Sequence, residues 1–185
     1  MLVYSMGASL DGYVADREGG FAWSEPGQDQ FAFHIEEVRR LGAHLLGRRL
    51  YETMLVWETD PSFRQDEAGA AFADAWAAVP KVVFSRTLDR VEGNARLATG
   101  SVADEVAAAL ESTDREVAIG GPTLAAQAIA ADLVDELRIL RNPVVVGGGN
   151  PLLPPLDRTL RFELVETRTF SGRIVLERHR RARGA

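Results

Sequence analysis

The sequence predicts an α/β protein with three layers, in which helices cover both faces of a mostly parallel central sheet and an antiparallel hairpin closes the C-terminus. Short apolar segments alternate with helical segments through most of the chain, and the last part is rich in strand-forming residues. The chain has 185 residues, 46% of them apolar and 26% charged. These values are typical of one globular domain, so we expect a single domain over 1–185.

A first strand is expected at 1–9, a short apolar run. Residues 10–27 are dense in Gly, Asp and Pro and predict a long loop, and loops of that length are usually functional or mobile. Apolar residues at helical spacing predict a helix over 28–42. The next elements are expected to be a strand at 43–47, a short helix at 48–56, an Ala-rich helix ending before Pro80, and strands at 81–85 and 95–100.

The second half repeats the alternation of strand and helix. Ser101 is the expected N-cap of a helix over 102–112. A strand at 116–121 ends in paired glycines, and Pro122 opens a helix at a position where its missing N–H costs nothing. A further strand begins near 134, and residues 160–180 predict a hairpin that turns near Ser171 and Gly172. The basic segment 178–185 is expected to be a frayed, solvated terminus.

Composition argues against several classes of function. The net charge of −6 disfavours non-specific binding of nucleic acid or anionic membranes. The absence of Cys rules out disulfides, Cys-ligated zinc and a thiol nucleophile. No stretch approaches the roughly 20 apolar residues of a spanning helix, and the first residues do not resemble a signal peptide. We expect a cytoplasmic protein with a small-molecule substrate and no metal.

The strand that ends at Gly120 and Gly121 carries the clearest signal for a ligand. In an open α/β sheet, ligands bind beyond the carboxyl ends of the strands. Paired glycines let the backbone approach a ligand closely, and the helix that begins at Pro122 directs free N–H groups toward it. A tight strand-to-helix turn is the alternative interpretation. The segment is not GxGxxG, so a standard Rossmann site is not expected.

Two other strand ends carry basic residues. Arg48 and Arg49 follow one strand, and Ser85 and Arg86 follow another. Arginine forks and a hydroxyl suit a phosphate monoester, such as the 2′-phosphate of a dinucleotide. Each pair alone is more often solvated surface, but together with the Gly-Gly turn they favour a cofactor of the NADP type.

Four segments taken together resemble a known family. They are GASLDGYVADREGGFAW, HLLGRRLYETM, VVFSRT and VAIGGPTLAAQAIAADLVDEL. Their order and spacing are similar to those of dihydrofolate reductases. They are more similar to the reductase domain of bacterial riboflavin-biosynthesis deaminase-reductases and its stand-alone relatives. The resemblance covers nearly the whole chain and implies a dihydrofolate-reductase-like fold with NADPH as hydride donor.

The resemblance also implies roles for individual residues. The positions that match cofactor-binding segments of the family are Ala8, Ala15, Trp23, Gly47, Arg48, Arg49, Leu50, Ser85, Arg86, Gly120, Gly121, Pro122, Thr123 and Leu124. Asp11 and Asp29 are the candidates for catalysis, although Asp11 could instead shape a turn and Asp29 could simply begin a helix. The matching Gly-Gly bond of folate enzymes is cis, so a cis bond is expected between Gly120 and Gly121.

The chain departs from the family pattern in one informative place. Riboflavin-pathway reductases have Glu just before the paired glycines, where this chain has Ile119. The phosphoribosyl-aminouracil substrate therefore does not follow from the resemblance. His34 is interpreted as a residue with a polar partner or a surface role rather than a catalytic one. Residues 147–150 could line the active site or could form a simple inter-strand loop.

The functional hypothesis is hydride transfer from NADPH to a small planar heterocycle, with the loop 10–27 closing over the nicotinamide. Two alternatives stay open at this point: a true dihydrofolate reductase, and a non-catalytic relative that binds nucleotides. The resemblance also implies a homodimer with its contact near the C-terminal strands.

Overall fold

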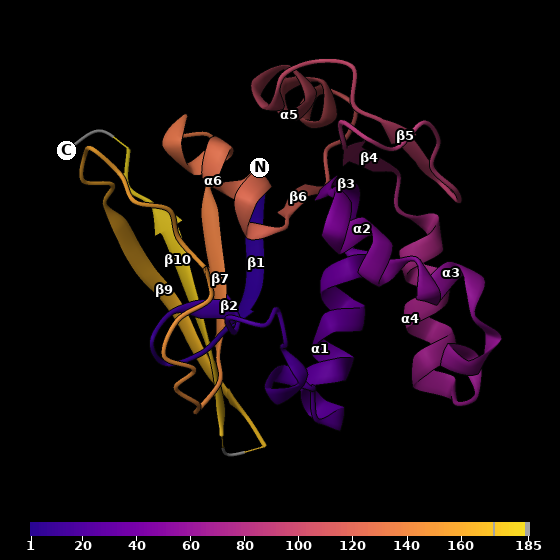
Figure 1. Ribbon diagram of the computed structural model, residues 1–185, viewed down its shortest axis with the longest axis horizontal. Coiled ribbons are helices and arrows are strands. Elements are labelled where there is room, and N and C mark those ends of the chain that lie inside the picture. The colour runs from indigo at the N-terminus through magenta and orange to yellow at the C-terminus, as the bar shows by residue number, and fades with distance from the viewer. Residues whose placement is uncertain (172, 184–185) are drawn as a thin grey trace.

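The computed structural model describes residues 1–171 and 173–183, and its centre is an eight-stranded sheet of order β5-β4-β3-β6-β1-β7-β10-β9 (Figure 1). The six strands from β5 to β7 are mutually parallel, and β10 runs antiparallel to both of its neighbours. The bounds of the strands in this sheet are β1 Leu2–Ala8, β3 Leu41–Gly47, β4 Lys81–Phe84, β5 Ala95–Leu97, β6 Glu116–Gly120, β7 Glu136–Arg141, β9 Phe162–Phe170 and β10 Ile174–Arg181.

Helices cover both faces of the sheet, as the sequence predicts. The bounds of the α-helices are α1 Gln28–Arg39, α2 Arg48–Met54, α3 Val56–Thr59, α4 Glu67–Ala78, α5 Val102–Glu111 and α6 Pro122–Ala130. Two short 3-10 helices, η1 Ala22–Ser24 and η2 Pro61–Arg64, lie in the connections. Helices α5 and α6 share one apolar core with the sheet, and α1, α2 and α4 share another on the opposite face. Consecutive residues of a strand pack into different cores, because their side chains point to opposite faces of the sheet.

Local sequence explains where several helices begin. Ser101 caps α5, and Asp104 completes a capping box by accepting a hydrogen bond from the Ser101 N–H. Pro122 stands at the first position of α6. The expected helix over 48–56 is instead two short helices, α2 and α3, which meet at Leu55.

A cluster of buried charges holds the amino ends of the strands to α1. Arg138 of β7 is buried and pairs with Glu37 of α1, Glu116 of β6 and Glu136 of its own strand. Arg178 of β10 shares Glu136 at 2.8 Å. Because every charge in the cluster has an opposite partner, the cluster links three strands and a helix without leaving an uncompensated ion.

Two segments differ from the sequence-based expectation. The loop 10–27 contains a strand, β2 Tyr13–Ala15, that pairs with β8 Asn150–Pro151 in a separate small sheet. The basic segment expected to fray is ordered through Arg183. Arg178 and Arg181 belong to β10, where Arg181 binds Asp132 at 2.6 Å. Ion pairs with acidic residues around the start of β7 explain this order, and the last two residues lie outside the described part of the chain.

Candidate functional site

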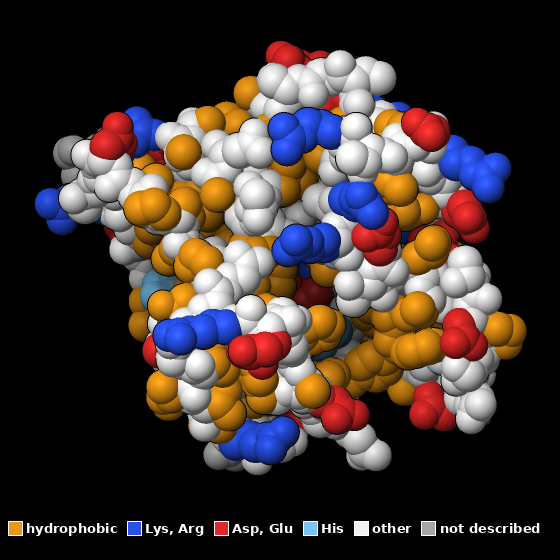
Figure 2. Space-filling view, viewed as in Figure 1, with side chains coloured by type: hydrophobic (Ala, Val, Ile, Leu, Met, Phe, Trp, Pro, Cys, Tyr) orange, Lys and Arg blue, Asp and Glu red, His pale blue; other side chains and the backbone are white. Residues whose placement is uncertain are grey.

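The segments that the sequence singles out meet at the carboxyl edge of the parallel strands. The strand register places Leu46 beside Gly120 and Gly47 beside Phe84, so β3, β6 and β4 end at about the same level. Helix α1 begins at the same edge and runs back toward the start of β3. The surface is hollowed over α1, between the segment that carries β2 and helices α2 and α3, with basic side chains near α2 (Figure 2).

The Gly120-Gly121 turn lies beside Gly47, where β3 ends. Gly121 has φ of 88°, a conformation that L side chains rarely adopt, and the position of a Cβ on Gly121 would lie 3.7 Å from the Gly47 backbone nitrogen. The expected cis bond between Gly120 and Gly121 is wrong, because the structure has no cis peptide bond among its described residues. The bond between Gly120 and Gly121 is trans, and the positive φ of Gly121 turns the chain from β6 into α6.

The N-terminus of α6 has no side-chain cap, although the Gly121 carbonyl accepts the N–H groups of Leu124 and Ala125. Pro122 has no N–H, so the Thr123 N–H and the positive end of the helix dipole are what this terminus presents at the carboxyl edge of the sheet. Leu124 itself is buried against the core, and Thr123 is exposed. Of these two predicted residues, only Thr123 has a side chain at the surface.

Arg48 joins the turn after β3 to the connection after β4. Its guanidinium lies 2.7 Å from Glu52 within α2 and 2.5 Å from the Thr87 hydroxyl. Ser85 accepts hydrogen bonds from the backbone N–H groups of Thr87 and Leu88, which leaves its own hydroxyl proton to donate. Sequence reasoning missed Thr87, which carries no signal of its own and is recognised only by its contact with Arg48.

Arg49 and Arg86 are exposed, and no carboxylate among the described residues lies within ion-pair distance of either. Leu50 is half-buried and faces the Gly120 backbone. The structure thus brings the three predicted groups together: the Arg48-Arg49 turn, the Ser85-Arg86 turn and the Gly120-Gly121 turn. Backbone donors and arginines at one edge can bind an extended polyanion.

Asp11 organises the loop that follows β7 rather than standing free. Its two carboxylate oxygens accept the backbone N–H groups of Val146 and Gly147, the latter at 2.8 Å. A hydrogen bond with Ser9, together with these amides, holds the pKa of the Asp11 carboxyl below its usual range. Arg17 donates to the Gly147 carbonyl at 2.7 Å. The glycine-rich segment 147–150 is therefore attached to the loop 10–27 by side chains and by the β2-β8 pair.

Asp29 connects the start of α1 to the end of the C-terminal hairpin. Its oxygens accept the Ser171 hydroxyl at 2.6 Å and the Ser171 backbone N–H at 2.7 Å. These bonds, the hydroxyl first, lower the pKa of the Asp29 carboxyl. Both oxygens are engaged, so the side chain is an ionised acceptor in this arrangement. The sequence contained no signal for this contact, which spans most of the chain.

The positions expected to flank a nicotinamide lie around the end of β1. Ala8 is fully buried, Ala15 pairs with Asn150 in the small sheet, and Trp23 lies in η1. His34 has a polar neighbour, since its Nε2 lies 3.4 Å from the amide nitrogen of Gln30. Burial lowers the pKa of His34 to about 4. An imidazole that is neutral at pH 7 is a poor proton donor.

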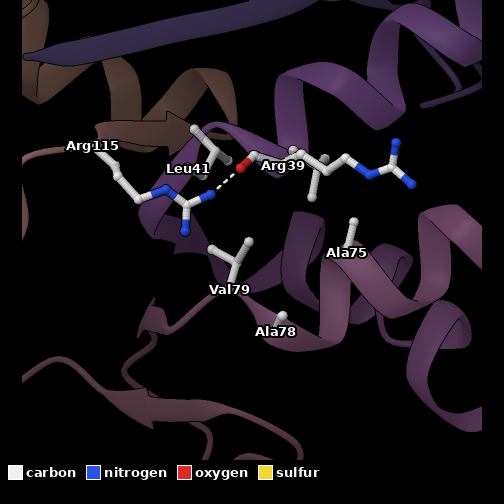
Figure 3. A pocket seen from close by; sticks show the side chains of 7 residues that line it. Arg39, Leu41, Ala75, Ala78, Val79 and Arg115 are labelled. Carbon is white, nitrogen blue, oxygen red and sulfur yellow. Dashed lines mark hydrogen bonds between the residues drawn. The ribbon is translucent and has the colours of Figure 1, made fainter.

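Two cavities lie away from this edge. One, of about 150 Å³, is formed at the C-terminal ends of α1 and α4, where Arg115 donates to the Arg39 carbonyl (Figure 3). The other lies under the 152–160 segment beside α6 and is lined by apolar side chains. The first surrounds a helix end whose carbonyl is already bound by Arg115, and the second is lined by apolar side chains, so neither contains the strand ends that the sequence singles out.

Comparison with known proteins finds a family and several relatives that resemble this chain. The RibD C-terminal domain family matches residues 1–176. A curated relative, Uncharacterized protein YyaP of Bacillus subtilis, is 26% identical over 179 residues, which is 94% of this chain and 91% of the relative. A crystal structure from Shewanella sp. PV-4, of a protein named for riboflavin biosynthesis, is 25% identical and has a TM-score of 0.77, with 98% of this chain and 99% of that chain covered.

Two further structures share the fold at lower identity. The reductase-deaminase of Thermotoga maritima, named diaminohydroxyphosphoribosylaminopyrimidine deaminase/5-amino-6-(5-phosphoribosylamino)uracil reductase, is 19% identical with a TM-score of 0.69. The match covers 98% of this chain and 56% of that chain. Dihydrofolate reductase of Enterococcus faecalis is 19% identical with a TM-score of 0.63, with 98% and 96% covered.

These likenesses confirm the dihydrofolate-reductase-like architecture predicted from the sequence: a mostly parallel sheet between helices, with antiparallel strands at its C-terminal side. Among the described residues, no helix is both long and apolar enough to cross a bilayer. From the match over nearly its whole length, the chain belongs to the RibD C-terminal domain family.

Proposed function

We propose that this protein is an NADPH-dependent reductase that transfers a hydride to a small planar heterocycle of the pteridine or aminouracil type. Membership of the RibD C-terminal domain family supports a reductase. The Thermotoga maritima relative is named as an aminouracil reductase, and the Enterococcus faecalis structure is a complex with NADP(H). The observation that carries the proposal is the meeting of three strand ends that offer backbone donors, a hydroxyl and arginines.

The residues at this edge fit the charges of a phosphorylated dinucleotide. In the proposal, the uncapped start of α6 and the Gly120-Gly121 backbone hold the pyrophosphate, because their N–H groups and the helix dipole favour an anion. Arg86 and Ser85, with Arg48 or Arg49, hold the 2′-phosphate, for which forked guanidinium groups are suited. Glycine at 121 is required by the positive φ that turns the chain into α6, since a Cβ there would meet the Gly47 backbone only at an ordinary contact distance of 3.7 Å.

The remaining residues position the reactants. NADPH, when bound, supplies the hydride. Ala8, Ala15 and Trp23 would flank the nicotinamide, and the loop 10–27, attached through Asp11 and Arg17 to the glycine-rich segment, would keep water out. Holding donor and acceptor in register is the main contribution of the protein to such a reaction.

The proton that completes the reduction is assigned to solvent. Asp11 and Asp29, the two candidates for catalysis, both have pKa values below the usual range because hydrogen bonds stabilise their ionised forms. A carboxylate that is ionised at neutral pH accepts protons and does not supply them. In the proposal, both residues act by positioning: Asp11 holds the glycine-rich segment, and Asp29 holds the hairpin against α1.

The cofactor assignment is tested by titrating the protein with NADPH and NADH and following nucleotide fluorescence. Arg86→Ala removes a guanidinium that the proposal assigns to the 2′-phosphate, so we expect NADPH affinity to fall at least tenfold, about 1.4 kcal/mol, with little change for NADH. Arg90→Ala is the control, because Arg90 is an exposed arginine on the same connection. Equal losses for both nucleotides would refute the 2′-phosphate assignment, and no binding of either would refute the reductase proposal.

A further inference from the structure

The cavity at the ends of α1 and α4 lies where β3 and β6 begin, opposite the edge that the cofactor proposal uses (Figure 3). Its volume is about 150 Å³. Its lining includes Val38, Leu41, Ala75, Val79 and Arg115. None of these residues belongs to the strand ends assigned to the dinucleotide, so a ligand in this cavity would be a separate one.

The floor of the cavity is apolar. The side chains of Val38, Leu41 and Val79 are buried and belong to the core that α1 and α4 share. Ala75 and Ala78 on α4 carry only methyl groups, which leaves the space beside this floor open. A cavity of this volume with apolar walls is large enough to hold a benzene ring.

Arg115 is held beside the cavity by its neighbours. Its backbone N–H donates to the Thr113 hydroxyl at 3.1 Å, and its guanidinium donates to the Arg39 carbonyl. Thr113 in turn fills the space over Gly42, where the position of a Cβ would overlap the threonine side chain. Glycine at 42 therefore lets the segment 113–115 lie against the start of β3, and the Arg115 side chain extends toward the cavity (Figure 3).

No carboxylate in the described part of the chain lies within ion-pair distance of Arg115. Two carboxylates on the neighbouring elements are bound to other cations: Glu36 pairs with Arg39 at 2.8 Å, and Glu116 pairs with the buried Arg138 at 2.8 Å. A guanidinium has five N–H donors, and the recorded side-chain bond of Arg115 is the one to the Arg39 carbonyl. A cation with donors to spare therefore stands beside an apolar cavity.

The carbonyl groups at the end of α4 do not compete for Arg115, because other donors bind them. The Lys81 amine donates to the Trp76 carbonyl at 2.7 Å. The Asn94 amide donates to the Ala78 carbonyl at 3.1 Å. The negative end of the α4 dipole is thus partly offset, so it opposes an anion in the cavity less strongly.

We propose that this cavity is a second ligand site, and that its ligand is a small monocarboxylate whose apolar part is the size of a benzene ring. The carboxylate binds the Arg115 guanidinium, whose fork matches two carboxylate oxygens. The apolar part lies on Val38, Leu41 and Val79. Its removal from water supplies most of the affinity, because an ion pair at an exposed arginine contributes little alone. The site does not depend on the proposed reductase function and takes no part in it.

The test is an NMR titration of the amide signals of the whole protein with three probes. They are benzoate, benzamide, which has the ring without the charge, and acetate, which has the charge without the ring. We expect benzoate to bind at least about fivefold more tightly than either of the others. The amides of Leu41, Val79 and Arg115 should shift most. Benzamide binding as tightly as benzoate, or benzoate shifting no amide around the cavity, would overturn the inference.

Two matched substitutions separate Arg115 from the other arginine at the cavity. Arg115→Gln should weaken benzoate binding at least about fivefold and leave benzamide binding unchanged. Arg39→Gln is the control, because the Arg39 guanidinium pairs with Glu36 and extends away from Arg115 (Figure 3), so this variant should change neither. Equal losses of benzoate affinity in the two variants would count against the site.

Ala75→Leu tests the cavity itself. A leucine side chain would occupy the space beside the apolar floor, so benzoate and benzamide should both bind at least about fivefold more weakly. Should this variant fail to fold, Ala78→Leu at an exposed position serves the same purpose. Unaltered benzoate binding would refute the site. NADPH affinity, titrated separately, should be the same in every variant, and benzoate binding by a protein that binds no NADPH would refute the reductase proposal while leaving this site standing.

Discussion

Gly120 occupies a position where a larger residue would meet side chains on the α1 side of the sheet. A Cβ there would lie 2.5 Å from the Leu50 Cδ2 and 2.9 Å from the His44 Nε2. The sequence suggested that the paired glycines serve the close approach of a ligand. The structure assigns them different constraints, because Gly120 is limited by packing and Gly121 by its positive φ.

Replacing Gly120 by Ala should therefore destabilise the fold by overpacking, at a cost of about 1–3 kcal/mol in the free energy of unfolding. The measurement is urea denaturation of the wild type and the variant. In a Leu50→Ala background, which removes the nearer obstacle, the cost of Gly120→Ala should fall by more than half. An equal cost in both backgrounds would show that contact with Leu50 is not the cause.

At the scale of elements, the loop 10–27 shows how a segment predicted as irregular gains structure from a distant part of the chain. Its strand β2 exists because β8 pairs with it, and Asp11 binds amides of the segment between β7 and β8. A three-residue strand has no pattern strong enough to be read from the sequence. The composition of residues 10–27 predicted a functional loop. That β2 in this loop pairs with β8 could be learned only from the folded chain.

The hydrogen bonds that Asp11 accepts from Val146 and Gly147 predict a local change in amide exchange when Asp11 is replaced. Asp11→Ala should raise the hydrogen-exchange rates of the Val146 and Gly147 amides, because their acceptor is lost, with little effect on the core strands. The measurement is amide exchange by NMR. Asp16→Ala provides a matched control: Asp16 accepts the amides of Glu18 and Gly20, so only those should exchange faster. Unchanged protection at Gly147 in Asp11→Ala would contradict the role given to Asp11.

At the scale of the whole molecule, two mostly enclosed histidines, His34 and His44, make stability depend on pH. Burial, and secondarily the charge of Lys81, lowers the pKa of His44 to about 3, and burial lowers that of His34 to about 4. The unfolded chain protonates both near the ordinary pKa of about 6.5, whereas the folded chain does not. Their contribution to stability is therefore complete above about pH 6.5 and is lost as the pH falls toward the folded pKa values.

Between pH 6.5 and 5, each histidine should remove up to roughly 2 kcal/mol from the free energy of unfolding, from 1.36 kcal/mol per unit. Denaturation by urea at pH 7 and pH 5 measures the drop. His44→Leu should reduce it by about half, since the variant cannot take up that proton. Hydrogen bonding to Arg96 lowers the pKa of Glu105 to about 2. The contribution of Glu105 to stability is therefore lost only below about pH 4.5, outside the range from pH 7 to pH 5. The same drop in His44→Leu would show that His44 is not responsible.

The expected homodimer stays a prediction. Strand β9 is one of the two edges of the large sheet, opposite β5, and Leu164 on it is 58% exposed. A long edge with exposed apolar residues is a surface that proteins usually cover. The alternation of apolar and charged residues in the hairpin predicted its two strands. The order of the sheet shows that β9 forms the edge and that β10 lies inside it, between β7 and β9.

The sequence alone determined the alternation of strands and helices, the carboxyl strand ends that carry Arg48, Ser85 and Gly120, and the resemblance that the family match confirms. These features are local, because periodicity, caps and turn residues act within a few positions. Only the tertiary structure decided the trans bond after Gly120, the attachment of Asp29 to Ser171, and the pairing of β2 with β8. Those depend on which distant segments meet, and contacts between residues more than a hundred positions apart leave no periodic trace in a single sequence.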